Sequence, residues 1–118
     1  MKYIEHYTDS SIIVEVLSDM VIIKSEQDVL DLMVNIDYQY NSRKIILHRD
    51  NLCSDFFDLK TGIAGFTMQK FSNYRFRAAI VGHINYKSKS LNAFIAECNR
   101  TRQVIFTDDV ATALKELT

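Results

Sequence analysis

Three short apolar runs constrain the fold of this chain more than any other feature of the sequence. They span Lys44 to Leu47, Arg77 to Val81 and Val104 to Phe106. Near-continuous apolar runs of this length are typical of strands that are buried on both faces. Helical spacing of apolar residues follows each run, so short strands alternate with helices of about 10 to 15 residues. This alternation predicts right-handed crossovers and a mostly parallel sheet.

The N-terminal part reads as extended chain. Lys2 to Tyr7 and Ser11 to Leu17 are rich in Ile, Val and Tyr, and Thr8-Asp9-Ser10 between them suits a hairpin turn. A turn at Ser18-Asp19 leads into a further short apolar run, Val21 to Ile23, which we expect to be extended too. We therefore predict a single α/β domain over residues 1–118, with a mixed β-sheet that begins with a hairpin and continues in β-α repeats.

Capping residues predict where the helices begin. Ser25 is a candidate N-cap, with Glu26 and Asp28 in the first turn, where the helix dipole favours acidic side chains. The candidates for the later helices are Ser88 or Ser90, and then Thr107, Asp108 or Asp109. Residues around Phe56 to Ser72 read as helical.

The charge balance argues against one class of partner. The chain has 14 basic and 15 acidic side chains, which gives a net charge of -1 with histidine neutral. Duplex nucleic acid is bound through a large basic face, because neutralised phosphates supply much of the affinity. We therefore expect no nucleic-acid partner.

The cysteines and the N-terminus favour a cytoplasmic location. Residues 1–10 contain no apolar core of the length of a signal peptide. No apolar run approaches the roughly 20 residues that span a bilayer, so we expect no membrane attachment. Cys53 and Cys98 stand alone, without C-x-x-C spacing or a nearby histidine pair, which is typical of free thiols in a reducing compartment. We expect neither a metal nor a cofactor.

A site is expected after the buried strands, because ligands of open α/β sheets bind beyond the carboxyl ends of the strands. The first such segment is 48–65, HRDNLCSDFFDLKTGIAG, and the second is 82–90, GHINYKSKS. A third lies at Thr107 to Asp109. The first two segments hold all three glycines and two of the three histidines of the chain.

The first segment contains a turn with two interpretations. Thr61 and Gly62 can cap a helix, and Gly62 and Gly65 can let that helix pass close to another backbone. Alternatively, Thr61 is a modified or ligand-binding residue at a helix N-terminus, flanked by Asp58 and Lys60. The sequence leaves both interpretations open.

Phe56 and Phe57 are candidates for a pocket or a partner surface. Adjacent residues of a helix point about 100° apart, so both rings are hard to bury in one core face. We expect one of them to be exposed, where it lines a pocket or a partner surface. Tyr38, Tyr40 and Tyr74 are further candidates for such a surface, and core packing explains them equally well.

The second segment suits a small anion. Lys87 and Lys89 stand on either side of Ser88, and free backbone N–H groups at a helix start add to their attraction for phosphate or carboxylate. A solvated loop before a capped helix explains the same residues. The candidate ligand-binding residues at these strand ends are His48, Asn51, His83, Lys87, Ser88 and Lys89.

A catalytic interpretation uses His48 and His83 as general acid and base, oriented by Asp50 or Asp58. Neither H-x-x-x-H nor G-x-S-x-G occurs, and no glycine-rich phosphate loop is present. A metal site from His48, His83 and Asp58 lacks diagnostic spacing as well. We therefore assign no catalytic residue and favour a protein without enzymatic activity.

Long stretches of the chain resemble a family of small bacterial proteins known as domain of unknown function 4180. The resemblance lies in EQDVLDLM, in HRDNLCSDFFDLKTGIAGFTMQKFSNYRFRAAIVG and in SKSLNAFIAECNR. It covers nearly the whole chain and implies no established activity. Relatives often have an acidic residue at the position of His83.

The strand and helix order also resembles the STAS domain of anti-sigma-factor antagonists. That family carries a turn similar to D-S-S-G-L-G, in which one serine is phosphorylated by a partner kinase. Here Thr61 stands at the second hydroxyl position and Gly62 at the following glycine, while Lys60 replaces the first serine and the acidic residue is Asp58. The resemblance implies a STAS-like fold and a candidate phosphorylation site at Thr61.

We predict a non-catalytic regulatory or protein-interaction module with a STAS-like fold, which binds a protein partner or a second copy of itself. Its candidate interaction residues are Phe56, Phe57, Asp58, Lys60, Thr61, Gly62 and Gly65. The alternative is a protein, or an enzyme, that binds a small anionic ligand at the carboxyl ends of the parallel strands. A symmetric subunit with Phe57 at its interface is a third prediction.

Overall fold

The sheet is built in the order of the chain. The computed structural model describes residues 1–84 and 88–118, in which the strands are β1 (Lys2–Tyr7), β2 (Ile12–Leu17), β3 (Lys44–His48), β4 (Arg77–Val81) and β5 (Val104–Thr107). They form one sheet in the order β1-β2-β3-β4-β5. β1 and β2 pair antiparallel, and the later neighbours pair parallel. The predicted α/β class, a mixed sheet that begins with a hairpin, is confirmed.

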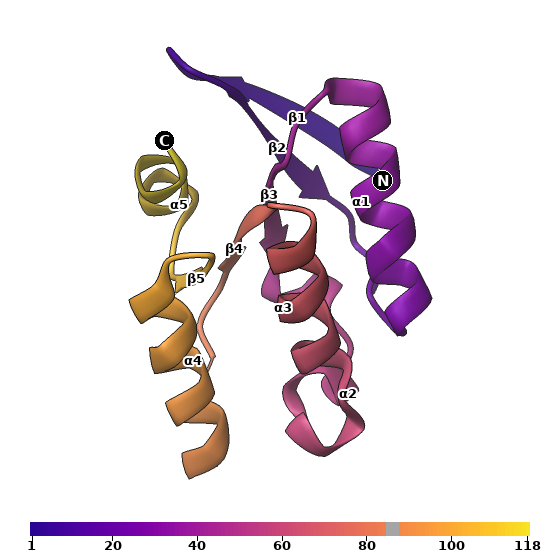
Figure 1. Ribbon diagram of the computed structural model, residues 1–118, viewed down its shortest axis with the longest axis vertical. Helices are drawn as coiled ribbons and strands as arrows, with labels where there is room; N and C mark the ends of the chain where they lie inside the picture. The colour runs from indigo at the N-terminus through magenta and orange to yellow at the C-terminus, as the bar shows by residue number, and fades with distance from the viewer. Residues whose placement is uncertain (85–87) are drawn as a thin grey trace.

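The helices are divided unequally between the two faces. Those of the described residues are α1 (Glu26–Tyr40), α2 (Ser54–Phe57), α3 (Ile63–Asn73), α4 (Lys89–Thr101) and α5 (Val110–Leu117), with short 3₁₀ turns η1 (Arg49–Asn51) and η2 (Leu59–Thr61). Right-handed crossovers between strands in sequential order place their helices on one face. Residues of α1, α3 and α4 accordingly share one core cluster, whereas α5 packs on another. Figure 1 shows α1 and α3 on the opposite side of the sheet from α5.

β2 shows how the two faces differ. Val14 and Val16 belong to the larger core beneath α1 and α3, and Ile13 belongs to the smaller core beneath α5. Because successive side chains of a strand alternate, Glu15 lies on the face of Ile13, where it is only 5% exposed. A carboxylate is stable in such surroundings only with partners, so β2 places a polar centre on the sheet.

The helix starts agree with the predicted caps. The side chains of Ser25, Ser88 and Asp109 each accept a hydrogen bond from the backbone N–H three residues further on. These bonds satisfy donors that a helix start leaves without an intrahelical acceptor. None of the helices in the described residues has the length and apolar character that a membrane crossing requires.

The segment around Phe56 to Ser72, which was predicted to be helical, consists of three helical elements, α2, η2 and α3. The carboxylate of Asp58 accepts a hydrogen bond from the backbone N–H of Lys60 and starts the 3₁₀ turn. Gly62 then has a φ of 83°, a left-handed conformation that glycine adopts without steric cost. The chain therefore changes direction twice before α3 begins.

The run Val21 to Ile23 does not form the expected strand. The backbone N–H groups of Ile22 and Ile23 both donate to the carbonyl oxygen of Asn51, at 2.8 and 3.0 Å. Only an isolated parallel bridge between Ile23 and Leu52 results. The apolar composition of this run reflects burial of Ile23 against the core and not a place in the sheet.

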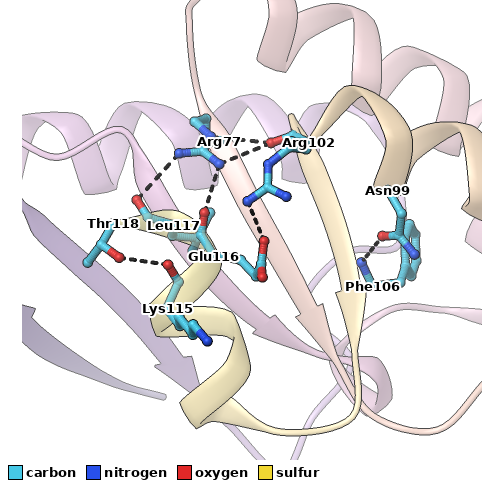
Figure 2. A network of polar contacts seen from close by, with 8 residues as sticks. All are labelled: Arg77, Asn99, Arg102, Phe106, Lys115, Glu116, Leu117 and Thr118. Atoms are coloured by element: carbon cyan, nitrogen blue, oxygen red, sulfur yellow. Dashed lines mark hydrogen bonds and ion pairs between the residues drawn. The ribbon is translucent and has the colours of Figure 1, made fainter.

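Arg77, the first residue of β4, forms hydrogen bonds with the C-terminal ends of two helices, as Figure 2 shows. Its guanidinium donates to the carbonyl oxygen of Arg102, just after α4, and to those of Glu116 and Leu117 at the end of α5. Arg102 also forms an ion pair with Glu116. The last carbonyl groups of a helix lack intrahelical donors and carry the negative end of its dipole, so a cation at this position stabilises both helices.

Candidate functional site

Glu15 joins two histidines from the strands on either side. Its Oε1 lies 2.8 Å from Nε2 of His6 on β1, and its Oε2 lies 2.7 Å from Nε2 of His48 at the end of β3. The side chain of Glu15 is 7% exposed, and those of His6 and His48 are 26% and 31% exposed. The two imidazole rings thus shield a nearly buried carboxyl group from solvent.

Hydrogen bonding keeps this carboxyl group ionised. Burial by itself raises the pKa of Glu15, but the hydrogen bonds from His48 and His6, together with the attraction of these rings, bring the pKa below its ordinary value. An ionised carboxylate can only accept hydrogen bonds. The Nε2–H group of each imidazole therefore donates a hydrogen bond to Glu15.

His48 is also tied to the turn that follows its strand. It forms a capping box with Asn51, in which the backbone N–H of His48 donates to Oδ1 of Asn51 at 3.2 Å. Asn51 is 1% exposed, and its Nδ2 donates to the carbonyl oxygens of Ser18 and Met20, each at 3.0 Å. His48 and Asn51, both predicted as ligand-binding residues, thus hold the turn after β2 against the end of β3.

A cleft of about 430 Å³ opens at the carboxyl ends of β3 and β4. A Cβ at Gly82 would lie 2.8 Å from Cβ of Arg49, and Gly82 has a φ of 138°, so its hydrogen side chain is required for this shape. Among the predicted site residues, the structure brings His48 and His83 to this cleft. Its lining consists of His48, Arg49, Asp50, Val81, Gly82, His83 and Asp108.

The described side chains that line this cleft include two imidazoles, two carboxylates and a guanidinium. No serine, threonine or cysteine occurs in the lining that the described residues provide, so it offers no hydroxyl or thiol nucleophile. Nε2 of His48 is engaged by Glu15. Across residues 1–84 and 88–118, no group of three or more His, Cys, Asp and Glu side chains can hold a metal ion.

Thr61 is exposed on η2, and its hydroxyl forms hydrogen bonds within the turn. Oγ1 lies 2.6 Å from the carbonyl oxygen of Asp55 and 2.9 Å from that of Asp58, to which it donates. It also accepts weakly from the N–H of Ile63 at 3.5 Å. The hydroxyl thus fastens the turn before α3, where Gly62 is the N-cap residue. Phosphorylation of Thr61 stays a prediction.

The other predicted polar and glycine residues of this turn lie at the surface. Lys60, Gly62 and Gly65 are exposed, as is Asp58. The expectation that the glycines allow close approach of another backbone is wrong, because a Cβ at Gly62 or Gly65 would have no heavy atom within 4 Å. Gly62 serves the backbone conformation of the turn instead.

The prediction that Phe56 or Phe57 is exposed is wrong. The two residues are 2% and 7% exposed and belong to the larger core. Their ring centroids lie 5.2 Å apart in an edge-to-face arrangement. The short helix α2 lies at the edge of this core, where the 100° between neighbouring side chains still leaves both rings inside.

The predicted anion loop is described only in part. Lys87 lies outside the described residues. The hydroxyl of Ser88 is used as the N-cap of α4, where it accepts from the N–H of Leu91 at 3.2 Å. Lys89 is the first residue of α4 and is exposed. The structural interpretation of Ser88 is therefore confirmed.

An exposed apolar surface lies over α1 and the end of α3. A groove of about 420 Å³ there is lined by Leu30, Met33, Val34, Asp37, Arg43, Tyr74 and Phe76. Val34, Tyr38 and Tyr74 are 65%, 89% and 52% exposed. Two of the three tyrosines proposed from the sequence thus contribute to this surface, which we call the α1–α3 face. Tyr40 packs against Tyr3 instead, with 5.6 Å between ring centroids.

Sequence reasoning missed His6 and Glu15. A signal was present, because Glu15 is the one charged residue in the run IIVEVL, which otherwise reads as a buried strand. A carboxylate in such a run requires a partner on a neighbouring strand. The identity of that partner depends on the pairing of β1, β2 and β3, which the sequence pattern did not fix.

These features define a class of protein: a small α/β domain with a sequentially ordered mixed sheet and a histidine–carboxylate–histidine bridge across its first three strands. The chain belongs to the family described as Domain of unknown function (DUF4180), whose profile matches residues 8–117. This finding confirms the family resemblance. No curated protein and no solved structure matches the chain, and the resemblance to the STAS domain stays a prediction.

Proposed function

We propose that this protein is a non-catalytic interaction module that recognises a partner protein through the α1–α3 face. The observation that carries the proposal is a pair of exposed apolar side chains on α1, Val34, which lines the groove and is 65% exposed, and Tyr38, which is 89% exposed. Val34 lies four residues earlier on α1, so the two side chains are neighbours on one helix face. Large apolar side chains gathered beside a hollow are typical of interaction sites.

Contacts within the protein fix the positions of several residues that line the groove. The guanidinium of Arg43 lies 6.0 Å from the ring centroid of Phe76 and donates to the carbonyl oxygen of Tyr74 at 2.9 Å. It also pairs with Asp37 at 3.4 Å. A groove organised in this way loses little conformational entropy on binding, which favours affinity.

The charged side chains at the edge of the groove determine which kind of partner segment it favours. Arg43 is about half exposed, and Arg75 is exposed nearby in the turn before β4. A partner segment with an apolar anchor and an acidic flank would complement both the groove and the cation of Arg75. The charge of Asp37 is balanced by Arg43 and does not oppose such a segment.

Site-specific photo-crosslinking tests the proposal. A photoreactive phenylalanine analogue at position 38, in cells that produce the protein, is expected to give a defined protein adduct. Tyr7 is the matched control, since it is a 73% exposed tyrosine on β1. For the partner identified in this way, the double substitution Val34→Ser and Tyr38→Ser should weaken binding by about tenfold or more without change in the circular dichroism spectrum.

Equal labelling from positions 38 and 7, or unchanged affinity in the double variant, would contradict the proposal. An adduct with a second copy of the chain would identify the occupant as the protein itself. Sedimentation at several concentrations checks that outcome, because the double substitution should then abolish the dimer.

A second candidate function is the binding of a small anion in the cleft at the carboxyl ends of the strands. Arg49 and His83 on its walls favour this function, since each can donate hydrogen bonds to an anion. The substitution His83→Gln should then weaken the stabilisation that the anion gives to the folded protein, measured as a shift in melting temperature.

A further inference from the structure

A third hollow, of about 600 Å³, lies at the opposite end of the sheet from the cleft of His48 and His83. It is formed where β3 and β4 begin, beside the turn of the β1–β2 hairpin and the ends of α1 and α3. We call it the amino-end hollow. Its lining is Ser10, Ser11, Ile12, Asp37, Asn41, Ser42, Arg43, Lys44, Arg75 and Arg77.

The lining of the amino-end hollow is strongly cationic, although the chain as a whole has a net charge of -1. Within the described residues it gathers four cations, at positions 43, 44, 75 and 77, and a single carboxylate, that of Asp37. The cations come from two stretches of the chain that are far apart in sequence: residues 43–44 at the start of β3, and residues 75–77 at the turn that leads into β4. The fold therefore concentrates positive charge that the composition does not reveal.

Two of the four cations are committed to the protein itself. Arg77 donates to carbonyl oxygens at the ends of α4 and α5 (Figure 2). Arg43 donates to the carbonyl oxygen of Tyr74 and pairs with Asp37. These contacts balance helix C-termini, which collect at this end of a parallel sheet. They account for Arg77 and Arg43 without any ligand.

The other two cations form no ion pair with any carboxylate among the described residues. Nζ of Lys44 donates to the hydroxyl of Ser11 at 3.0 Å, and that group is neutral. The guanidinium of Arg75 has no hydrogen-bond or ion-pair partner among the residues that the structure describes. Lys44 also lies directly opposite Arg77 in the pairing of β3 with β4. Burial and the neighbouring charge of Arg77 lower the pKa of Lys44.

Arg75 occupies its position at a conformational cost. Its φ of 59° is left-handed, a conformation that favours glycine or asparagine. The turn itself therefore gives no reason for an arginine here. The geometry points to a ligand for its side chain, since the same residue lines the hollow beside Lys44.

We propose that the amino-end hollow binds a phosphomonoester dianion, with Lys44 and Arg75 as the residues that supply its countercharge. Two cations without an ion pair among the described residues match the double negative charge of this group, and guanidinium and ammonium groups are the side chains that recognise it. The proposal does not rest on the proposed protein partner, because its probes are small ions.

Thermal unfolding with inorganic phosphate tests the amino-end hollow, at constant ionic strength set with sodium chloride. Phosphate is expected to raise the melting temperature along a saturable curve, and acetate at equal concentration is not. Lys44→Met and Arg75→Asn should each weaken the apparent affinity by about tenfold, as expected for the loss of a charge-assisted hydrogen bond. Lys2→Met is the control, because Lys2 is exposed at the start of β1 and lies outside the lining of the hollow.

The variant Arg75→Asn separates binding from folding. Asparagine tolerates the left-handed conformation, so this variant should unfold at the wild-type temperature or higher without phosphate, while its response to phosphate falls. An equal response in the wild type, Lys44→Met and Arg75→Asn would overturn the proposal. So would no saturable response, an equal effect of acetate, or an equal loss in Lys2→Met.

The phosphoryl group can belong to a metabolite or to a phosphorylated side chain of a protein. Competition distinguishes these sources, with glycerol 3-phosphate as one probe and a short phosphoserine peptide as the other. Displacement of phosphate by either probe supports the site, and the stronger competitor identifies the source. Failure of both to displace phosphate would overturn the assignment to phosphomonoesters.

Discussion

Replacement of Glu15 by glutamine tests whether the bridge between His6 and His48 stabilises the fold. The carboxylate accepts hydrogen bonds at 2.8 and 2.7 Å from the two imidazole groups and is almost fully buried. A hydrogen bond to a charged group contributes about 1.5 to 3 kcal/mol to stability. Glutamine keeps the shape and one acceptor, but it turns an NH₂ group toward the second Nε2–H.

The expected loss is therefore close to the value of one charge-assisted bond. A buried amide costs less to desolvate than a buried carboxylate, which offsets part of the loss. We expect Glu15→Gln to lower the free energy of unfolding by about 2 kcal/mol at neutral pH. Urea unfolding followed by circular dichroism measures this difference. The matched control is Glu5→Gln on β1, an exposed carboxylate for which a change below about 0.5 kcal/mol is expected.

The pH dependence gives the sharper test. The pKa of Glu15 is lowered in the folded protein, so its stabilising contribution is complete above the pKa of the unfolded chain, about 4.3. That contribution is lost as the pH falls through the lower pKa of the folded state. Wild type should therefore lose stability more steeply than Glu15→Gln between about pH 5 and pH 3.

Two results would refute this reasoning. One is a difference between wild type and Glu15→Gln that stays constant over the acidic range. The other is a loss at neutral pH no larger than that of the Glu5→Gln control. Either result would mean that the histidines do not hold Glu15 in its ionised form.

Two further predictions concern single positions. Gly82→Ala should lower the free energy of unfolding by about 2 kcal/mol in a urea titration, because its Cβ would meet Cβ of Arg49 at 2.8 Å and its φ of 138° is unsuited to alanine. Gly65→Ala is its control and should be neutral or stabilising, since no atom lies within 4 Å. Burial and the charge of Glu97 raise the pKa of the Cys98 thiol to about 11, so iodoacetamide at mildly alkaline pH should alkylate Cys53 first. Mass spectrometry that finds Cys98 labelled as fast as Cys53 would contradict the burial of Cys98.

Local sequence patterns were sufficient to predict much of the fold. The strand from Arg77 to Val81 and the caps at Ser25, Ser88 and Asp109 follow from residues that are close together in the chain. Short apolar runs, helical spacing and capping side chains act within a few residues, so their effects can be predicted without the partners of each element.

The polar centres could not be predicted in the same way. His6, Glu15 and His48 meet because β1, β2 and β3 are neighbours in one sheet, and Lys44 and Arg75 line one hollow because β3 begins near the turn before β4. Such meetings depend on pairing over long sequence separations. The rule that ligands bind beyond the carboxyl ends of parallel strands does not point to the amino-end hollow either.

The sequential order of the strands also bears on how the sheet forms. Each strand pairs with its predecessor in the chain, so β1 and β2 can form a template to which β3, β4 and β5 are added in turn. No later strand has to insert between two that are already paired. A chain emerging from the ribosome can therefore extend its sheet at one edge as each strand becomes available. Arg77, which begins β4, then binds the ends of α4 and α5 as these last helices arrive.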